Sequence, residues 1–265
     1  MSGDEVFTLL VYIVLVLALG ARRWACIATV NELAAPRGAR LAAVAALGLP
    51  LLLTATVLGL WSADDVRTDP AYFAYYLVMG GAWMAFFSWV WELLGLSLRD
   101  DVVERRSPAS ARVIIGAYTG TAACFAGANI GNGPGWWVVF FCASLSTLAL
   151  FVLWLLLNAA TSAGSRITVD GDPATGARVA VLLAAAGIVL GRAVAGDWVS
   201  LADTLSSFIG LCIPAILLFG MEIAVHKLSK PRSGEPMPSP IAWGAVPAVA
   251  YLAVAAVSLA AAGPW

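Results

Sequence analysis

The sequence predicts an all-α protein, a polytopic membrane bundle of eight transmembrane helices forming one integral membrane domain over residues 1–265. Three observations carry this prediction. The chain is 61% hydrophobic and only 12% charged, it contains eight apolar stretches, and its basic loops alternate with loops nearly free of Lys and Arg. Soluble domains carry about a quarter charged residues. The composition therefore excludes an ordinary soluble domain and a disordered chain.

The apolar stretches have the length of membrane-spanning helices. A helix rises about 1.5 Å per residue, so a hydrocarbon core about 30 Å thick takes about 20 residues. The long stretch 113–159 is divided by a glycine- and proline-rich turn at 131–135. The expected spans cover residues 6–20, 41–61, 71–96, 113–130, 136–159, 179–195, 204–225 and 241–262.

The distribution of positive charge predicts the orientation. Thirteen of the fifteen Lys and Arg residues fall in the loops after the first, third, fifth and seventh spans. The opposite loops hold only Arg67, and Arg192 falls inside the sixth span. Because loops rich in Lys and Arg face the cytoplasm, both termini are predicted outside. The net charge of −1 argues against a nucleic-acid partner.

Three segments that enter a span from the cytoplasmic side resemble one another. Each opens a span rich in small residues, which is followed by an outer turn and a bulkier span that ends inside at Glu92, Asn158 or Glu222. This pattern predicts three tandem, parallel helical hairpins at about 36–98, 108–162 and 173–228, flanked by spans 6–20 and 241–262. The alternative is that Pro and Arg are simply common where helices begin. The segments read Pro36-Arg-Gly-Ala-Arg40, Pro108-Ala-Ser-Ala-Arg112 and Pro173-Ala-Thr-Gly-Ala-Arg178.

Glycines at four-residue spacing predict close helix packing. Gly116 and Gly120 share one helix face, as do Gly187 and Gly191. Such faces let a neighbouring backbone approach closely within a membrane.

Arg192 is the candidate site residue with the strongest physical argument, because a charge inside a span is unfavourable unless it is paired or hydrated. It lies towards the outer end of its span, and the expected partners are Asp197 and Asp203 on the following turn. One interpretation is an anion or proton site in an outer cavity. The alternative is an arginine that reaches the outer interface and pairs there.

Two further pairs of residues are candidates. Glu92 and Glu222 lie near the inner ends of their spans, and Glu222 stands one helical turn before His226. A proton relay and a structural role both remain open for them. Asn129 and Asn132, in the glycine-rich segment 127–137, either line a polar mouth or belong to a tight extracellular turn. A phosphate loop is disfavoured because no lysine follows.

No catalytic motif of a hydrolase, zinc protease or nucleotide-binding enzyme is present, so no enzyme activity and no cofactor are expected. His226 is the only histidine, which argues against a metal site.

Two strings of residues resemble a known family. They are Asn129-Ile-Gly-Asn-Gly-Pro-Gly-Trp-Trp137 and Gly191-Arg-Ala-Val-Ala-Gly-Asp-Trp198, and they are similar to the YjfL-like bacterial inner-membrane proteins of unknown function. The resemblance covers roughly residues 111–227. It implies a bundle of helical hairpins in the bacterial cytoplasmic (inner) membrane, but no substrate and no catalytic residue.

The function expected from these observations is the binding or conduction of a small solute or ion. The alternative is a non-transporting scaffold or a subunit of a membrane complex. The expected partners are the lipid bilayer and either a second copy of the chain or a membrane-complex protein.

Overall fold

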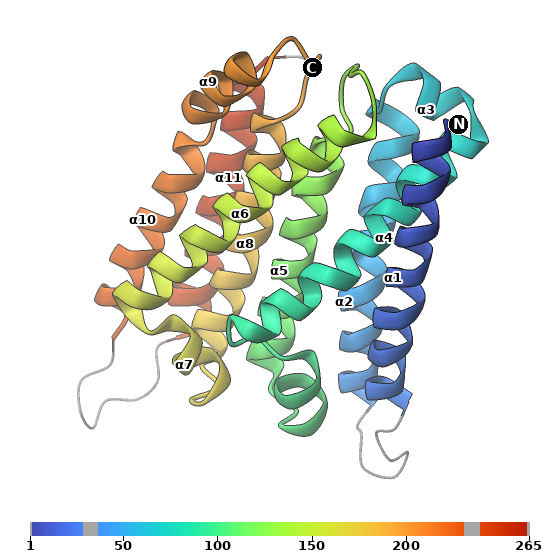
Figure 1. Cartoon of the computed structure of the whole chain (residues 1–265). Helices are drawn as coiled ribbons and strands as arrows, with labels where there is room; N and C mark the ends of the chain where they lie inside the picture. The colour runs from blue at the N-terminus through green and yellow to red at the C-terminus, as the bar shows by residue number, and fades with distance from the viewer. Residues whose placement is uncertain (1, 29–36, 231–238, 264–265) are drawn as a thin grey trace.

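The computed structural model describes residues 2–28, 37–230 and 239–263, which are almost entirely helical (Figure 1). Within these ranges there is no strand, only an isolated bridge that joins Ser62 to Ile130 and Gly131. The α-helices and two π-helical turns are α1 (Gly3–Ala28), α2 (Arg37–Trp61), α3 (Asp64–Thr68), α4 (Pro70–Leu93), η1 (Leu98–Glu104), α5 (Pro108–Gly127), α6 (Trp136–Thr161), α7 (Ala163–Thr168), α8 (Pro173–Ala193), α9 (Leu201–Leu211), α10 (Ile213–Leu228), η2 (Ile241–Ala245) and α11 (Val246–Ala261).

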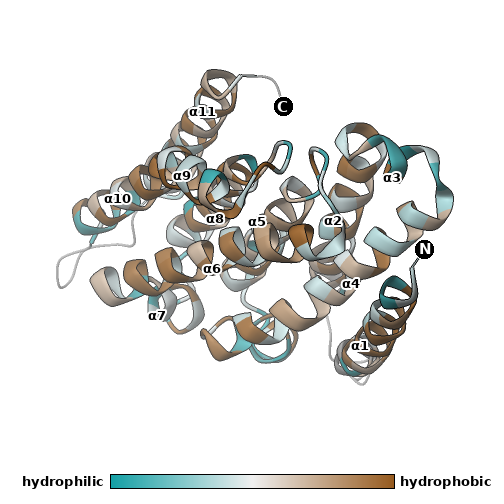
Figure 2. Cartoon of the chain, turned by 45° about the horizontal axis from the view of Figure 1, so that its top comes forward, coloured by the Kyte–Doolittle hydropathy of each residue, from teal (hydrophilic) through white to brown (hydrophobic). Residues whose placement is uncertain are grey.

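In the described part of the chain, seven helical segments are long and apolar enough to cross a membrane. Large apolar side chains lie exposed along them, as on α1, where Phe7, Leu10 and Leu17 are 58–67% exposed. Hydrocarbon rather than water is the solvent that suits such a surface. The fold therefore fits a multi-pass membrane protein in a lipid environment, and Figure 2 shows polar residues gathered towards helix ends, most clearly at α3. The seven segments are Gly3–Arg22, Arg40–Trp61, Pro70–Leu93, Trp136–Thr161, Pro173–Ala193, Leu201–Leu228 and Ile241–Ala261.

The fourth expected span, residues 113–130, corresponds to α5, which is not among these seven segments. Helix α5 lies in the middle of the bundle and contacts α2, α4, α6 and α8 (Figure 1). Most of its residues are buried against protein, and they include Gly116, Gly120 and Thr121. A helix surrounded by other helices does not need the apolarity of one that faces lipid. This explains why α5 is less apolar than its neighbours.

Two of the expected spans are not single regular helices, and the first helix extends beyond its expected span. The seventh span is broken into α9 and α10 at Cys212, because Pro214 in the first turn of α10 lacks an amide proton. The last span begins with the π-helical turn η2 before α11, and α1 continues to Ala28, well beyond residue 20. The start of the first expected hairpin, with Pro36, lies outside the described residues.

Helices α5 and α8 meet along a seam of glycines, as their spacing predicts. A Cβ built on Gly116 would lie 2.1 Å from the carbonyl oxygen of Ala180, and one on Gly120 would lie 2.3 Å from that of Leu183. Further along the seam, a Cβ on Gly187 would lie 2.3 Å from the Cα of Gly120. The two backbones therefore touch, and no larger residue fits between them.

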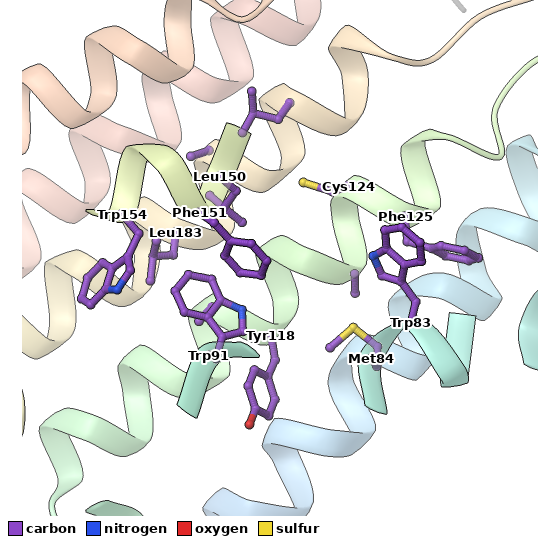
Figure 3. Close-up of a cluster of buried hydrophobic side chains, with 14 of the residues drawn as sticks. Trp83, Met84, Trp91, Tyr118, Cys124, Phe125, Leu150, Phe151, Trp154 and Leu183 are labelled. Atoms are coloured by element: carbon purple, nitrogen blue, oxygen red, sulfur yellow. The ribbon is translucent and has the colours of Figure 1, made fainter. Parts of the chain in front are cut away.

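An aromatic cluster joins α4 to α5 and α6 (Figure 3). The ring centroid of Trp91 lies 4.8 Å from that of Phe151 and 6.0 Å from that of Trp154, both in edge-on contact. The Trp91 indole nitrogen donates to the Thr121 hydroxyl at 2.9 Å, which satisfies a polar group that would otherwise be buried alone. The cluster holds α4 and α6 obliquely across α5.

Candidate functional site

Both chain termini lie at one end of the bundle, together with α3 and α9 (Figure 1). A cavity of about 310 Å³ opens there between α3, the α5–α6 loop and the α8–α9 loop. We call it the loop cavity. The polar and aromatic residues that line it include Asp65, Tyr76, Asn129, Asn132, Asp197, Trp198, Asp203, Thr204 and Ser207. It thus brings together four of the residues expected from the sequence to form a binding site, namely Asn129, Asn132, Asp197 and Asp203.

Backbone hydrogen bonds hold the two loops of the cavity together. The amide of Gly196 donates to the carbonyl of Ile130 at 2.8 Å, and the amide of Trp198 donates to that of Asn132 at 2.8 Å. Gly131 has a φ of +100° and approaches Gly196 so closely that a Cβ would lie 2.2 Å from its carbonyl carbon. Only glycine satisfies both requirements, so the glycine-rich string is needed for the loops to meet.

Asp197 locks the same junction with its side chain. Its Oδ1 accepts from the amide of Asn132 at 2.7 Å and from the Asn132 side-chain nitrogen at 3.1 Å. Asp203 belongs to the start of α9, where its Oδ2 accepts from the Ser200 hydroxyl at 2.6 Å and its amide donates back to that hydroxyl at 3.1 Å. Both carboxylates are exposed at the cavity wall.

Asn129 is the buried polar residue of the cavity, with only 4% of its surface exposed. Its Nδ2 donates to the carbonyl of Phe125 at 2.8 Å, and no described residue bonds its Oδ1. The carbonyl of Phe125 can only accept, so the amide nitrogen must face it and the oxygen must be the unsatisfied atom. A buried acceptor of this kind calls for a donor from water or a ligand.

The charges that line the loop cavity are all negative. Its acidic lining residues are Asp65, Asp197 and Asp203, and none of the described residues that line it is a Lys, Arg or His. The described part of the chain holds no group of three His, Cys, Asp or Glu side chains that could hold a metal ion. The lining offers oxygen acceptors together with the aromatic residues Tyr76 and Trp198.

Arg192 lies beside a second cavity of about 280 Å³, mostly apolar, between α8, the α9–α10 junction and α11. Its guanidinium donates to the carbonyls of Ala262 at 2.9 Å and Gly263 at 3.2 Å, at the end of α11, and to that of Ala195 at 3.4 Å. A cation is favourable at a helix C-terminus. The expected partners are engaged elsewhere, Asp197 with Asn132 and Asp203 with Ser200. Both interpretations of Arg192, an anion or proton site and an arginine at the outer interface, stay predictions.

A second polar group lies at the opposite end of the bundle and centres on Arg178 and Glu222, whose side chains are fully buried. The Arg178 Nε donates to both carboxylate oxygens of Glu222, at 2.9 and 3.1 Å. Its Nη1 donates to the carbonyl of Trp243 at 2.8 Å, and its Nη2 donates to the Thr175 hydroxyl at 2.9 Å. The Tyr251 hydroxyl donates to Glu222 at 2.8 Å. We call these five residues the polar clamp.

The clamp ties α8 to α10, η2 and α11, and it continues into α7. Thr175 donates to Asp172 at 2.6 Å, and Asp172 pairs with Arg166 at 3.0 Å. The expected proximity of His226 to Glu222 is present, with Nδ1 3.9 Å from Oε1. Glu92 lies half-buried near the end of α4, on a helix outside those that carry the clamp.

Sequence reasoning missed Arg178, Thr175 and Tyr251. It counted Arg178 among the loop cations, although the residue stands more than a turn inside a helix that begins at Pro173. The distance of Arg178 from the helix start was the signal that could have indicated its burial. It also missed Asp65 and Tyr76, which reach the loop cavity from elements distant in the sequence.

No protein-family model, no curated protein and no solved structure matches the chain.

Proposed function

We propose that the protein is an inner-membrane protein of eight crossings that binds a small polar solute in the loop cavity from the outside. The observation that carries this proposal is the cavity itself. Pockets for small ligands measure about 300–1,000 Å³ and combine apolar walls with a few placed polar groups. The loop cavity has about 310 Å³ and a buried carbonyl, Asn129 Oδ1, without a partner among the described residues.

The topology supports an outward-facing cavity. Seven apolar segments together with α5 make eight crossings, and an even number agrees with two termini at one end (Figure 1). The α5 helix has 20 residues, which gives it a length of about 30 Å, enough to span the hydrocarbon core. The segments joining α4 to α5 and α6 to α8 lie at the opposite end, and they carry Arg99, Arg105 and Arg166. Cationic loops are cytoplasmic, so the loop cavity faces outside.

Helix contacts support the tandem hairpins. The first helices of the three expected units, α2, α5 and α8, pack in series, α2 against α5 and α5 against α8. The second helix of one unit also contacts the first of the next, α4 with α5 and α6 with α8. The resemblance to the YjfL-like family, which we propose as the family of this chain, agrees with such units.

The polar clamp suggests how binding would serve transport. At the end opposite the loop cavity, buried hydrogen bonds join α8 to α10 and α11. Along the seam, α5 and α8 touch backbone to backbone. We propose that this arrangement is the outward-open state of a carrier, in which the clamp closes the cytoplasmic side.

A solute screen on the purified protein in detergent tests the binding step. A solute that binds only the folded state raises the melting temperature by mass action. The panel contains amines, amino acids, sugars, nucleosides and carboxylates. We expect at least one class to raise the melting temperature, and Ser207→Trp, which fills the cavity, to remove the effect. Ser206→Trp is the matched control, because Ser206 is exposed on α9 but does not line the cavity.

Flux then separates a carrier from a binding protein. The solute identified by the screen should enter proteoliposomes that contain the wild type and not those that contain Ser207→Trp. A panel in which no solute stabilises the wild type would contradict the proposal and would favour the scaffold alternative.

A further inference from the structure

We infer that the loop cavity selects solutes that carry an ammonium group with N–H donors. This inference rests on the proposed function, because it names the class of solute that the same cavity would take. It stands on two independent observations, the sign of the charges that line the cavity and the unsatisfied side-chain carbonyl of Asn129, a buried residue of its lining.

The charges around the cavity favour a cation. Asp65, Asp197 and Asp203 bring three carboxylates to its wall. Both hydrogen bonds from Asn132 go to Oδ1 of Asp197, so they engage one of its two oxygens. The nearest basic residues along the chain are turned to other partners, Arg67 to Asp64 and Arg192 to the carbonyls of α11. The cavity therefore has a negative potential, which attracts cations and repels anions.

The buried carbonyl narrows the class further. Asn129 is 4% exposed, its nitrogen faces the carbonyl of Phe125, and its oxygen has no partner among the described residues. Leaving such an acceptor unsatisfied is unfavourable, and an N–H donor removes the penalty. A quaternary ammonium has no N–H donor, and a carboxylate would add hydrogen-bond acceptors to a cavity whose polar groups already accept. A primary ammonium satisfies both the charge and the carbonyl.

The aromatic lining suits the same ligand. Tyr76 and Trp198 both line the cavity, and Trp198 is held edge-on against Trp137 with ring centroids 5.3 Å apart. Aromatic faces attract ammonium groups and also accept apolar carbon. The preferred solute is therefore an ammonium attached to a small apolar or aromatic body.

Three probes of equal size and different charge test the inference. Benzylammonium, benzyl alcohol and benzoate share one ring and carry charges of about +1, 0 and −1 at neutral pH. Binding to the purified protein in detergent is measured by equilibrium dialysis, with protein-free micelles subtracted. We expect benzylammonium to bind, benzyl alcohol to bind at least about tenfold more weakly, and benzoate not to bind at the same concentrations.

Carboxylate-to-amide variants locate the selectivity. At about 6 Å, one unit charge changes the affinity for a monovalent cation by about threefold in water and by about a hundredfold at an effective dielectric constant of about 20. We expect Asp65→Asn and Asp203→Asn each to weaken benzylammonium binding by about tenfold, with a smaller effect in high salt. Benzyl alcohol binding should hardly change. Asp170→Asn, an exposed carboxylate that does not line the cavity, is the control and should leave both affinities unchanged.

The outcomes separate this inference from the proposed function. Equal binding of all three probes, abolished by Ser207→Trp, would overturn the ammonium inference and leave the solute-binding cavity standing. Tighter binding of benzoate, or benzylammonium binding that the amide variants do not weaken, would also overturn it. Failure of every probe would refute the inference, and only failure of the whole solute panel would refute the proposed function as well.

Discussion

Replacing Arg178 or Glu222 alone should lower the free energy of unfolding at least as much as replacing both residues together. Glu222→Leu deletes two hydrogen bonds to a charged group, the bifurcated one from the Arg178 Nε–H and the one from the Tyr251 hydroxyl, and it leaves a fully buried guanidinium without its counter-charge. Hydrogen bonds to charged groups contribute about 1.5–3 kcal/mol each, so the sum is about 3–6 kcal/mol. This agrees with the loss of about 3–5 kcal/mol typical of breaking a buried ion pair.

The double variant Arg178→Leu/Glu222→Leu removes both charges together. What remains is the loss of one hydrogen bond each at Thr175, Tyr251 and the carbonyl of Trp243, each worth about 1 kcal/mol. We therefore expect the double variant to lose no more stability than either single variant, with a coupling free energy of at least about 2 kcal/mol.

A double-mutant cycle on the free energy of unfolding measures this coupling, with the protein in mixed micelles and an increasing fraction of denaturing detergent. The matched control is the exposed pair Arg99–Glu104, with side chains 61% and 55% exposed. Its cycle should give a coupling of about 0.5 kcal/mol. Additive losses at Arg178 and Glu222, with a coupling near that of the control, would refute the burial argument.

Three more predictions concern the α5–α8 seam, the loop cavity and the turn η1 that precedes α5. Gly116→Leu should lower the free energy of unfolding by at least about 2 kcal/mol, because the leucine side chain would meet the Ala180 backbone. Gly220 has open space around it, so Gly220→Ala should raise the free energy of unfolding by about 0.5–1 kcal/mol in the same assay. Asn129→Leu should keep the melting temperature close to the wild-type value while benzylammonium binding is lost, because removal of a buried unsatisfied carbonyl offsets the lost hydrogen bond to Phe125; a large drop in melting temperature would contradict this. Burial raises the pKa of Asp101 above its ordinary value of 3.8. The protonated carboxyl group therefore favours the folded state below that value, and this stabilisation is lost as the pH rises through the folded-state pKa. Asp101→Asn should therefore gain stability relative to the wild type as the pH rises above about 4, and a constant difference across the pH series would contradict it.

Much of the fold could be predicted because hydrophobic length is a local property. The expected spans match helices of the structure, and the break within Leu201–Leu228 follows from Pro214, which was visible in the sequence. The central position of α5 was not visible, because it depends on which helices surround it. Its lower apolarity and its glycines are signs of burial that only the packing makes clear.

The sequence indicated residues in polar segments, but it did not indicate partners that lie far away along the chain. Asn129 and Asn132 come from the α5–α6 loop, and Asp197 and Asp203 come from the α8–α9 loop and the first turn of α9; the structure brings them to one cavity. For Arg192 the expected partners were carboxylates close in sequence, whereas two of its three carbonyl partners lie about seventy residues away at the end of α11. Apart from Thr175 on the same helix, the partners of Arg178 in the clamp come from α10 and η2, and Tyr251 of α11 reaches the clamp through Glu222, so no local pattern could reveal them.

An electronegative cavity that opens to the outside is the central claim, and thiol labelling of Ser207→Cys tests it directly. The four native cysteines are first replaced, and intact cells are exposed to membrane-impermeant methanethiosulfonates, one carrying a trimethylammonium and one a sulfonate. Ser206→Cys on the same helix reports the reactivity outside the cavity, and Ser165→Cys in α7 reports the opposite end.

We predict that Ser207→Cys reacts from outside. The ratio of its labelling rate with the cationic reagent to that with the anionic reagent should exceed the same ratio for Ser206→Cys by about tenfold or more. Ser165→Cys should react only after the membrane is opened. Equal rate ratios at the two α9 positions, or reaction of Ser207→Cys only from the cytoplasmic side, would contradict the central claim.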